Sequence, residues 1–224
     1  MRLKDIPGAI CVILCVIAFT MMGCARTVKP ASPVDTPKEH YLAGLKLLDD
    51  KDPLKPENEF LRAIALDRKS PFGYTGMAAM NLNRHQYGRA LRYANRALKR
   101  DPKFADAAFI KARVYFERKN DDWIEDSLPA FLRVLELEPE RGRALYHLGE
   151  TCLAAYRFNE ARSYFEKAAG LKSEYQDRSR QRKELADRIL EVKPVTEEGL
   201  RAALIEKSTR ADLCRLLSID FRLR

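Results

Sequence analysis

The sequence predicts an all-α fold in which pairs of helices stack into a solenoid. Ala, Leu, Arg, Glu and Lys are abundant along the 224 residues, and β-branched residues are scarce after residue 30, a composition typical of helices. Small residues recur 34 positions apart, for example Ala63 and Ala97, which indicates repeated helix–turn–helix units. Asp101-Pro102 ends one unit, because proline disfavours a helical conformation in the residue before it.

The clearest repeat spans residues 71–104. Its first helix carries Ala78, its second carries Ala90 and Ala97, and Pro102 closes it. These residues resemble the consensus of the tetratricopeptide repeat (TPR), a helix–turn–helix in which small residues let two helices approach closely. The resemblance implies four successive units, at 37–70, 71–104, 105–141 and 142–175. Four units are enough to bury a continuous core, so the array should fold on its own.

Two units depart from the repeat pattern. The unit 105–141 is three residues longer than 34, and we expect the excess in an enlarged turn at 119–126. In the unit 37–70, Pro56 stands where alanine is expected, so the second helix should begin near it, with the proline in its first turn.

Two further helical stretches follow the repeats. Residues 176–193 are strongly polar with a few apolar positions, which predicts a capping helix that covers the last repeat. Residues 194–224 predict a C-terminal helical segment. Within it, residues 208–213 resemble a short stretch of S-layer-homology modules, and an ordinary helical cap is the alternative.

The N-terminus predicts export from the cytoplasm. Basic residues precede an uncharged, largely apolar run from Gly8 to Gly23. This run is shorter than the ~20 apolar residues of a membrane-spanning helix, but its length suits a signal peptide. It ends in Met-Met-Gly-Cys at residues 21–24, which resembles the lipobox of bacterial lipoproteins.

The lipobox resemblance implies a signal peptide over residues 1–23 and a lipid on Cys24. Two or more acyl chains would hold a soluble domain on a bilayer. The proline-rich segment 24–36 should be a disordered tether between lipid and repeats. Because Ala25 rather than Asp follows the cysteine, the resemblance favours the outer membrane over the inner one, with the protein facing the periplasm. An uncleaved membrane anchor with an incidental cysteine is the alternative.

Catalytic and metal-binding patterns are missing from the sequence. His40, His85 and His147 each stand without a partner at metal-ligand spacing, and we interpret them as solvated or half-packed helix residues. Cys152 and Cys214 could form a disulfide or remain two buried thiols. We therefore expect no enzyme, no metal and no cofactor.

The resemblance also indicates a binding groove, because the first helices of TPR arrays line a concave face. Exposed aromatic residues and arginines are typical of a protein-binding surface. The groove positions of the family correspond here to Tyr41, Phe72, Phe109, Arg113, Phe116, Arg143, Tyr146 and Glu150. For each of these residues, packing beneath a neighbouring helix is the alternative.

Two other features allow more than one interpretation. The second helix of the unit 71–104 is basic, with Arg89, Arg92, Arg96 and Lys99 on one face. It could meet anionic lipid or an acidic partner, or it could be a solvated outer face. Trp123 could anchor a partner or plug the space against the next helix.

Together these features predict a membrane-anchored interaction scaffold of the bacterial cell envelope. It would be an adaptor or assembly factor for an outer-membrane protein, pilus or secretion complex, with a protein or peptide partner. We expect neither nucleic acid nor a small-molecule substrate. The alternative is a structural cell-surface protein that attaches to cell wall or polymer through residues 194–224.

Overall fold

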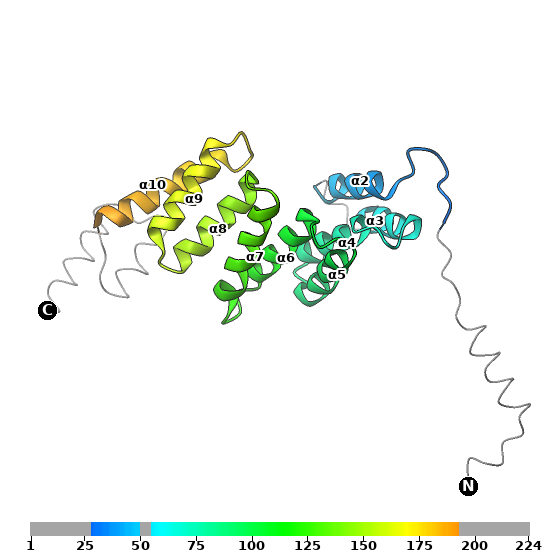
Figure 1. The fold of residues 1–224 in the computed structure, drawn as a ribbon, viewed down its shortest axis with the longest axis horizontal. Helices are drawn as coiled ribbons and strands as arrows, with labels where there is room; N and C mark the ends of the chain where they lie inside the picture. The colour runs from blue at the N-terminus through cyan, green and yellow to red at the C-terminus, as the bar shows by residue number, and fades with distance from the viewer. Residues whose placement is uncertain (1–27, 50–54, 193–224) are drawn as a thin grey trace, which may run out of the picture.

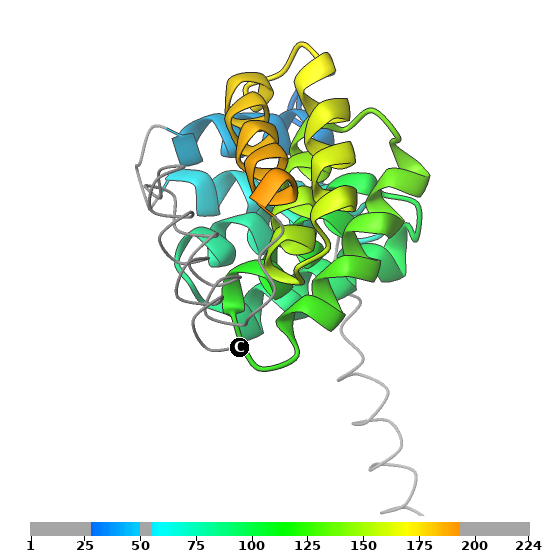
Figure 2. The ribbon, with the colours of Figure 1, turned by 90° about the vertical axis from the view of Figure 1, so that its left-hand side faces the viewer.

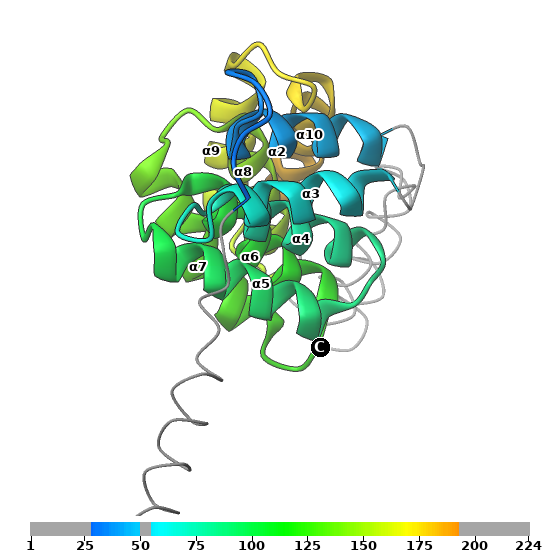
Figure 3. The ribbon, with the colours of Figure 1, turned by 90° about the vertical axis from the view of Figure 1, so that its right-hand side faces the viewer.

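The computed structural model describes residues 28–49 and 55–192, and within these ranges all regular structure is helical. The helices follow one another along the long axis of the molecule (Figure 1). Views from its two ends show successive helix pairs rotated about that axis (Figures 2 and 3). The described helices are α2 (Pro37–Asp49), α3 (Lys55–Leu66), α4 (Phe72–Asn83), α5 (Tyr87–Arg100), α6 (Ala105–Arg118), α7 (Trp123–Leu137), α8 (Gly142–Ala154), α9 (Phe158–Gly170) and α10 (Gln176–Val192).

The helix pairs form the predicted TPR solenoid. One pair lies in each of the four repeat ranges, from α2–α3 to α8–α9, and α10 occupies the range of the capping helix. Each helix packs on the next one in sequence, and the first helices α2, α4, α6 and α8 also contact one another in that order. This second set of contacts joins the pairs into a continuous array.

The enlarged turn expected at 119–126 is wrong in extent. Helix α6 ends at Arg118 and α7 begins at Trp123, so the turn is confined to residues 119–122. Lys119 adopts a left-handed conformation with φ 51° and ends α6. Glu125 and Asp126 lie in the first turn of α7, where carboxylates stabilise the positive end of the helix dipole. The additional residues therefore lengthen the helices, and α7 reaches 15 residues.

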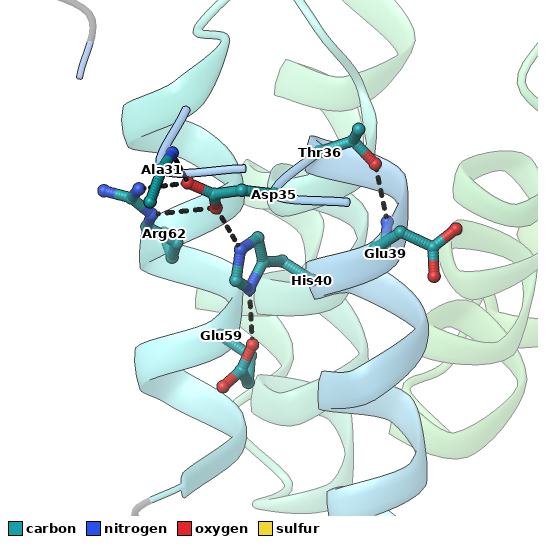
Figure 4. Close-up of polar contacts among 7 residues, drawn as sticks. All are labelled: Ala31, Asp35, Thr36, Glu39, His40, Glu59 and Arg62. Carbon is teal, nitrogen blue, oxygen red and sulfur yellow. Dashed lines mark hydrogen bonds and ion pairs between the residues drawn. The ribbon is translucent and has the colours of Figure 1, made fainter. Parts of the chain in front are cut away.

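The tether expected at 24–36 is also corrected, because its described part is held against the repeats. The Val28 amide donates to the Ala65 carbonyl of α3 at 2.9 Å. Asp35 forms an ion pair with Arg62 of α3, whose Nε lies 3.2 Å from Asp35 Oδ1 (Figure 4). The sequence pattern missed this contact because its partners are 27 residues apart.

His40 links this segment to α3, as Figure 4 shows. Its Nε2 lies 2.7 Å from Asp35 Oδ1, and its Nδ1 lies 2.5 Å from Glu59 Oε2. Partial burial lowers the pKa of His40, but the bonds to Glu59 and Asp35 outweigh it and raise the pKa above 6.5. Both ring nitrogens can donate to carboxylates only in the imidazolium form. His40 was expected to stand alone, and it is instead part of an ion-pair cluster.

The core is built from aromatic rings that pack on residues without side chains. Phe60 of α3 is fully buried, and a Cβ atom added to Gly44 or to Gly76 would overlap its ring. The last pair repeats this arrangement: a Cβ at Gly149 would lie 2.6 Å from Cε1 of the buried Phe165. Gly44 and Gly149 thus make room for a ring from the second helix of their own pair, and Gly76 makes room for a ring from the preceding pair.

Several expectations fall outside the described residues, namely the signal peptide, Cys24, Cys214 and the segment 194–224. Cys152 lies inside them and has a buried, free thiol. Among the residues that the structure describes, no helix has the length and apolar character needed to cross a bilayer.

Two glycine substitutions, one against the Phe165 ring and one in open space, should have opposite effects on the free energy of unfolding. Gly149→Ala should destabilise the protein by ~1–3 kcal/mol, because the new methyl group overpacks a buried ring. Gly88→Ala is the matched control, since an added Cβ meets no atom within 4 Å at this helical position. It should be neutral or stabilise the protein by up to ~1 kcal/mol. Thermal and urea unfolding would measure both, and equal effects would contradict this account of the packing.

Candidate protein-binding surface

Tyr41 and Phe72 lie together where α2, α4 and α6 meet. Tyr41 is buried, its ring lies 5.6 Å from that of Phe72, and its hydroxyl donates to Asp106 Oδ2 at 3.0 Å. Burial and the Asp106 charge raise the pKa of Tyr41. Phe72 is half-buried and packs edge-on against Phe104. Tyr41 therefore joins neighbouring repeats and offers little surface to a partner.

Phe109 is also buried, with 2% of its surface exposed. The guanidinium of Arg141 lies 4.6 Å from its ring centre and is held there by a 2.6 Å bond to Asp106 Oδ1. Phe109 and Tyr41 thus pack beneath their neighbours, as the alternative interpretation of the groove positions allowed.

The other predicted aromatic residues surround His147 on α8. Its ring stacks on Phe131, with centres 5.7 Å apart and an interplanar angle of 11°. Phe116 meets it edge-on at 5.1 Å. We call this group the His147 cluster, and it consists of His147, Phe109, Phe116, Phe131, Tyr146 and Tyr175. The cluster brings together α6, α7, α8 and the turn before α10.

The His147 imidazole is neutral in the folded protein. Both ring nitrogens are buried and have no hydrogen-bond partner among the described residues. Burial and, after it, the positive charges of Arg113, Arg143, Arg178 and Lys119 together lower the pKa of His147 from 6.5 to about 3. A second proton would add a charge where water is excluded and four cations are near.

Acidic residues balance some of these cations. Arg113 pairs with Glu117, and Arg143 pairs with Glu174 at 2.6 Å. Glu150, a predicted groove residue, is held by both Nε and Nη2 of Arg182 at 2.6 Å.

Arg178 and Lys119, the other two cations near His147, form no ion pair with any described residue. Lys119 Nζ lies 3.2 Å from the ring centre of Trp123 and 4.2 Å from that of Phe116. Burial lowers the pKa of Lys119. Trp123 packs edge-on against Phe116, which favours the interpretation of this residue as a plug.

The sequence patterns missed several members of this surface. His147 was taken as an isolated helix residue, although it is the centre of the cluster. Tyr175 is the final residue of the last predicted repeat, and Arg178 lies in the predicted capping helix, so neither was expected in a binding surface. The spacing of Arg178 and Arg182, four positions apart on one helix, is a signal that could have placed both on the face of α10 that meets α8.

His147 predicts a stability difference between acid and neutral pH. Because its pKa is lower in the folded state, the unfolded state binds the extra proton first. The stabilisation is present above pH 6.5 and is lost as the pH falls towards about 3. Between pH 7 and 4.5 the unmodified protein should lose ~2–3 kcal/mol more unfolding free energy than His147→Phe, which keeps the ring stacking. Urea unfolding at both pH values checks this, and equal losses would contradict it.

No group of three or more His, Cys, Asp or Glu residues in the described ranges is placed to hold a metal ion.

The family model described as "Anaphase-promoting complex, cyclosome, subunit 3" matches residues 83–168. The human protein O-mannosyl-transferase TMTC3 is 27% identical over 140 residues, which cover 62% of this chain and 15% of that protein. The similarity thus concerns a small part of that transferase.

Three solved structures share the architecture. Pseudomonas aeruginosa pilF matches with a TM-score of 0.58 and 14% identity over 83% of each chain. A thermophilic TPR protein of Thermus thermophilus matches with a TM-score of 0.55 and 14% identity over 75% of this chain and 99% of that one. MamA from Desulfovibrio magneticus matches with a TM-score of 0.55 and 17% identity over 80% and 95% of the two chains.

At these identities the structural similarity shows the fold. That fold is typically an interaction scaffold rather than a catalytic one. The matched family model, the related structures and the repeated helix pairs agree that the chain has the tetratricopeptide-repeat fold.

Proposed function

We propose that this protein is an adaptor of the bacterial cell envelope, held at a membrane by a lipid on Cys24. It binds an acidic segment of a partner protein at the His147 cluster. The observation that carries the proposal is the set of four cations around a neutral histidine in an aromatic surface.

The aromatic part of the surface suits protein binding. Tyr146 and Tyr175 are half-buried, and their ring centres lie 5.0 Å apart. Tyrosines that are fixed by packing lose little conformational freedom when they bind, and they are frequent in the energetic centres of interfaces. A preformed surface of this kind can hold a peptide at a small ordering cost.

The charges define the chemistry of the partner. Arg178 and Lys119 have no ion pair with a described residue, and Arg143 has only an exposed pair with Glu174. Exposed pairs contribute little stability, so a partner carboxylate can replace Glu174 at low cost.

The envelope role is supported by the lipobox-like residues 21–24, which precede the described part of the chain. The matched family model is that of a subunit of a multiprotein complex, which agrees with an adaptor role. A lipid anchor would raise the local concentration of the binding surface at the membrane and so favour weak contacts with a membrane-associated partner.

Removal of two surface cations tests the binding site. Arg143→Gln with Arg178→Gln should reduce the amount of an envelope partner captured from native membranes by about tenfold, because charge-assisted bonds to the partner are lost. Both residues are exposed, so the fold should persist. Quantitative mass spectrometry of the captured proteins measures the effect.

The matched control is Lys69→Gln with Lys103→Gln, which removes the same charge from exposed positions in two other turns. It should retain the partner. If both double variants capture the same proteins, the binding site is not at the His147 cluster.

A variant that lacks residues 194–224 tests the alternative function. If this truncation alone abolishes attachment to cell wall or polymer, the structural cell-surface alternative is correct.

A third variant tests the anchor. Cys24→Ser removes the thiol that would carry the lipid, so the protein should leave the membrane fraction and fail to incorporate a labelled fatty acid. Cys152→Ser is the control, because this buried thiol is separate from the lipobox-like residues. Label in the Cys24→Ser protein, or none in either form, would contradict the anchor.

A further inference from the structure

A second surface lies on helices α3, α4 and α5 and shares no residue with the His147 cluster. It contains a cavity of about 590 Å³, a volume within the range of small-ligand sites. Its polar lining has two amides and four guanidiniums, from Asn81, Asn95, Arg84, Arg89, Arg92 and Arg96. Met77, Met80 and Tyr93 add an apolar part to the lining.

The charges that line the cavity are unbalanced. Among its described lining residues the one carboxylate is Glu57, and it pairs with Arg84 at 3.4 Å. Arg89 donates to the neutral side chain of Gln86 at 3.3 Å. Arg92 has no ion pair with a described residue, and Arg96 lies over the Tyr74 ring, 4.7 Å from its centre. The cavity therefore has an excess of positive charge.

The arginines of α5 that line the cavity destabilise the helix through their mutual repulsion. Arg89, Arg92 and Arg96 follow the three- and four-residue spacing of one helix face, and α5 has no Asp or Glu. Like charges at this spacing repel one another and destabilise a helix. A bound anion would reduce this repulsion and so stabilise α5.

We propose that this cavity binds a ligand that carries phosphate groups. One guanidinium can satisfy both oxygens of a carboxylate, whereas a phosphate has additional acceptor oxygens and more charge and can be shared by several guanidiniums. The row from Arg89 to Arg96 extends about 10 Å along the helix, so it matches more than one phosphate group. The exposed amide of Asn95 is a further donor in the lining, whereas the buried Asn81 amide already donates to the Met77 carbonyl at 2.7 Å.

Two sources supply this chemistry: the headgroups of an anionic phospholipid surface and a soluble polyphosphate. Tripolyphosphate is the probe for the shared chemistry, measured by calorimetry with the full chain in non-ionic detergent. Arg89→Gln with Arg92→Gln should weaken its binding about tenfold or more. Both side chains are exposed, so circular dichroism should show an unchanged helical content.

The matched control is Lys99→Gln with Lys103→Gln, which removes two nearby charges that do not line the cavity. It should leave tripolyphosphate affinity within about twofold, because only long-range screened charge is lost. Co-sedimentation with phosphatidylcholine vesicles, with and without phosphatidylglycerol, then separates the two sources. All three proteins keep the same N-terminus, so a difference between them reports on the cavity.

If the cavity variant alone loses the preference for phosphatidylglycerol, the ligand is a lipid surface. If it loses tripolyphosphate binding but keeps that preference, the ligand is a soluble polyphosphate. Equal behaviour of the cavity variant and the control in both assays would overturn the site. Tighter binding of a polyglutamate peptide than of tripolyphosphate would overturn the phosphate assignment.

Discussion

The structure depends on the contact between a buried phenylalanine ring and a helix that has no side chain at the point of contact. Phe60 fills the space left by Gly44 and Gly76, and Phe165 fills the space left by Gly149. The close approach lets the first and last helix pairs bury an aromatic ring, and the pairs stack through their first helices. Without these glycines the rings would push the helices apart.

The functional surface follows from this stacking. Because α6 and α8 contact each other, Phe109 and Phe116 of one repeat meet His147 of the next. The capping helix adds Arg178 and Arg182, so the surface is complete only where the array ends. Its positive charge does not come from one basic segment of the sequence. It results from the meeting of α6, α8 and α10.

The repeat units were predictable because their signals are local. A 34-residue period, small residues and helix-stopping prolines all act within one pair of helices. The missed features connect residues that are far apart in the sequence. Asp35 meets Arg62, Arg141 covers Phe109, and the environment of His147 comes from four parts of the chain. Groove positions carried over from the family therefore placed the aromatic residues correctly on the first helices, but could not show which of them are buried.

The most direct test of the binding surface is photo-crosslinking in native membranes. A benzophenone amino acid replaces Tyr146 in one protein and Tyr156, an exposed tyrosine of the α8–α9 turn, in another. The account predicts a discrete crosslinked envelope protein from position 146 and none from position 156. The same crosslinks from both positions, or crosslinks from 156 alone, would contradict the placement of the partner on the His147 cluster.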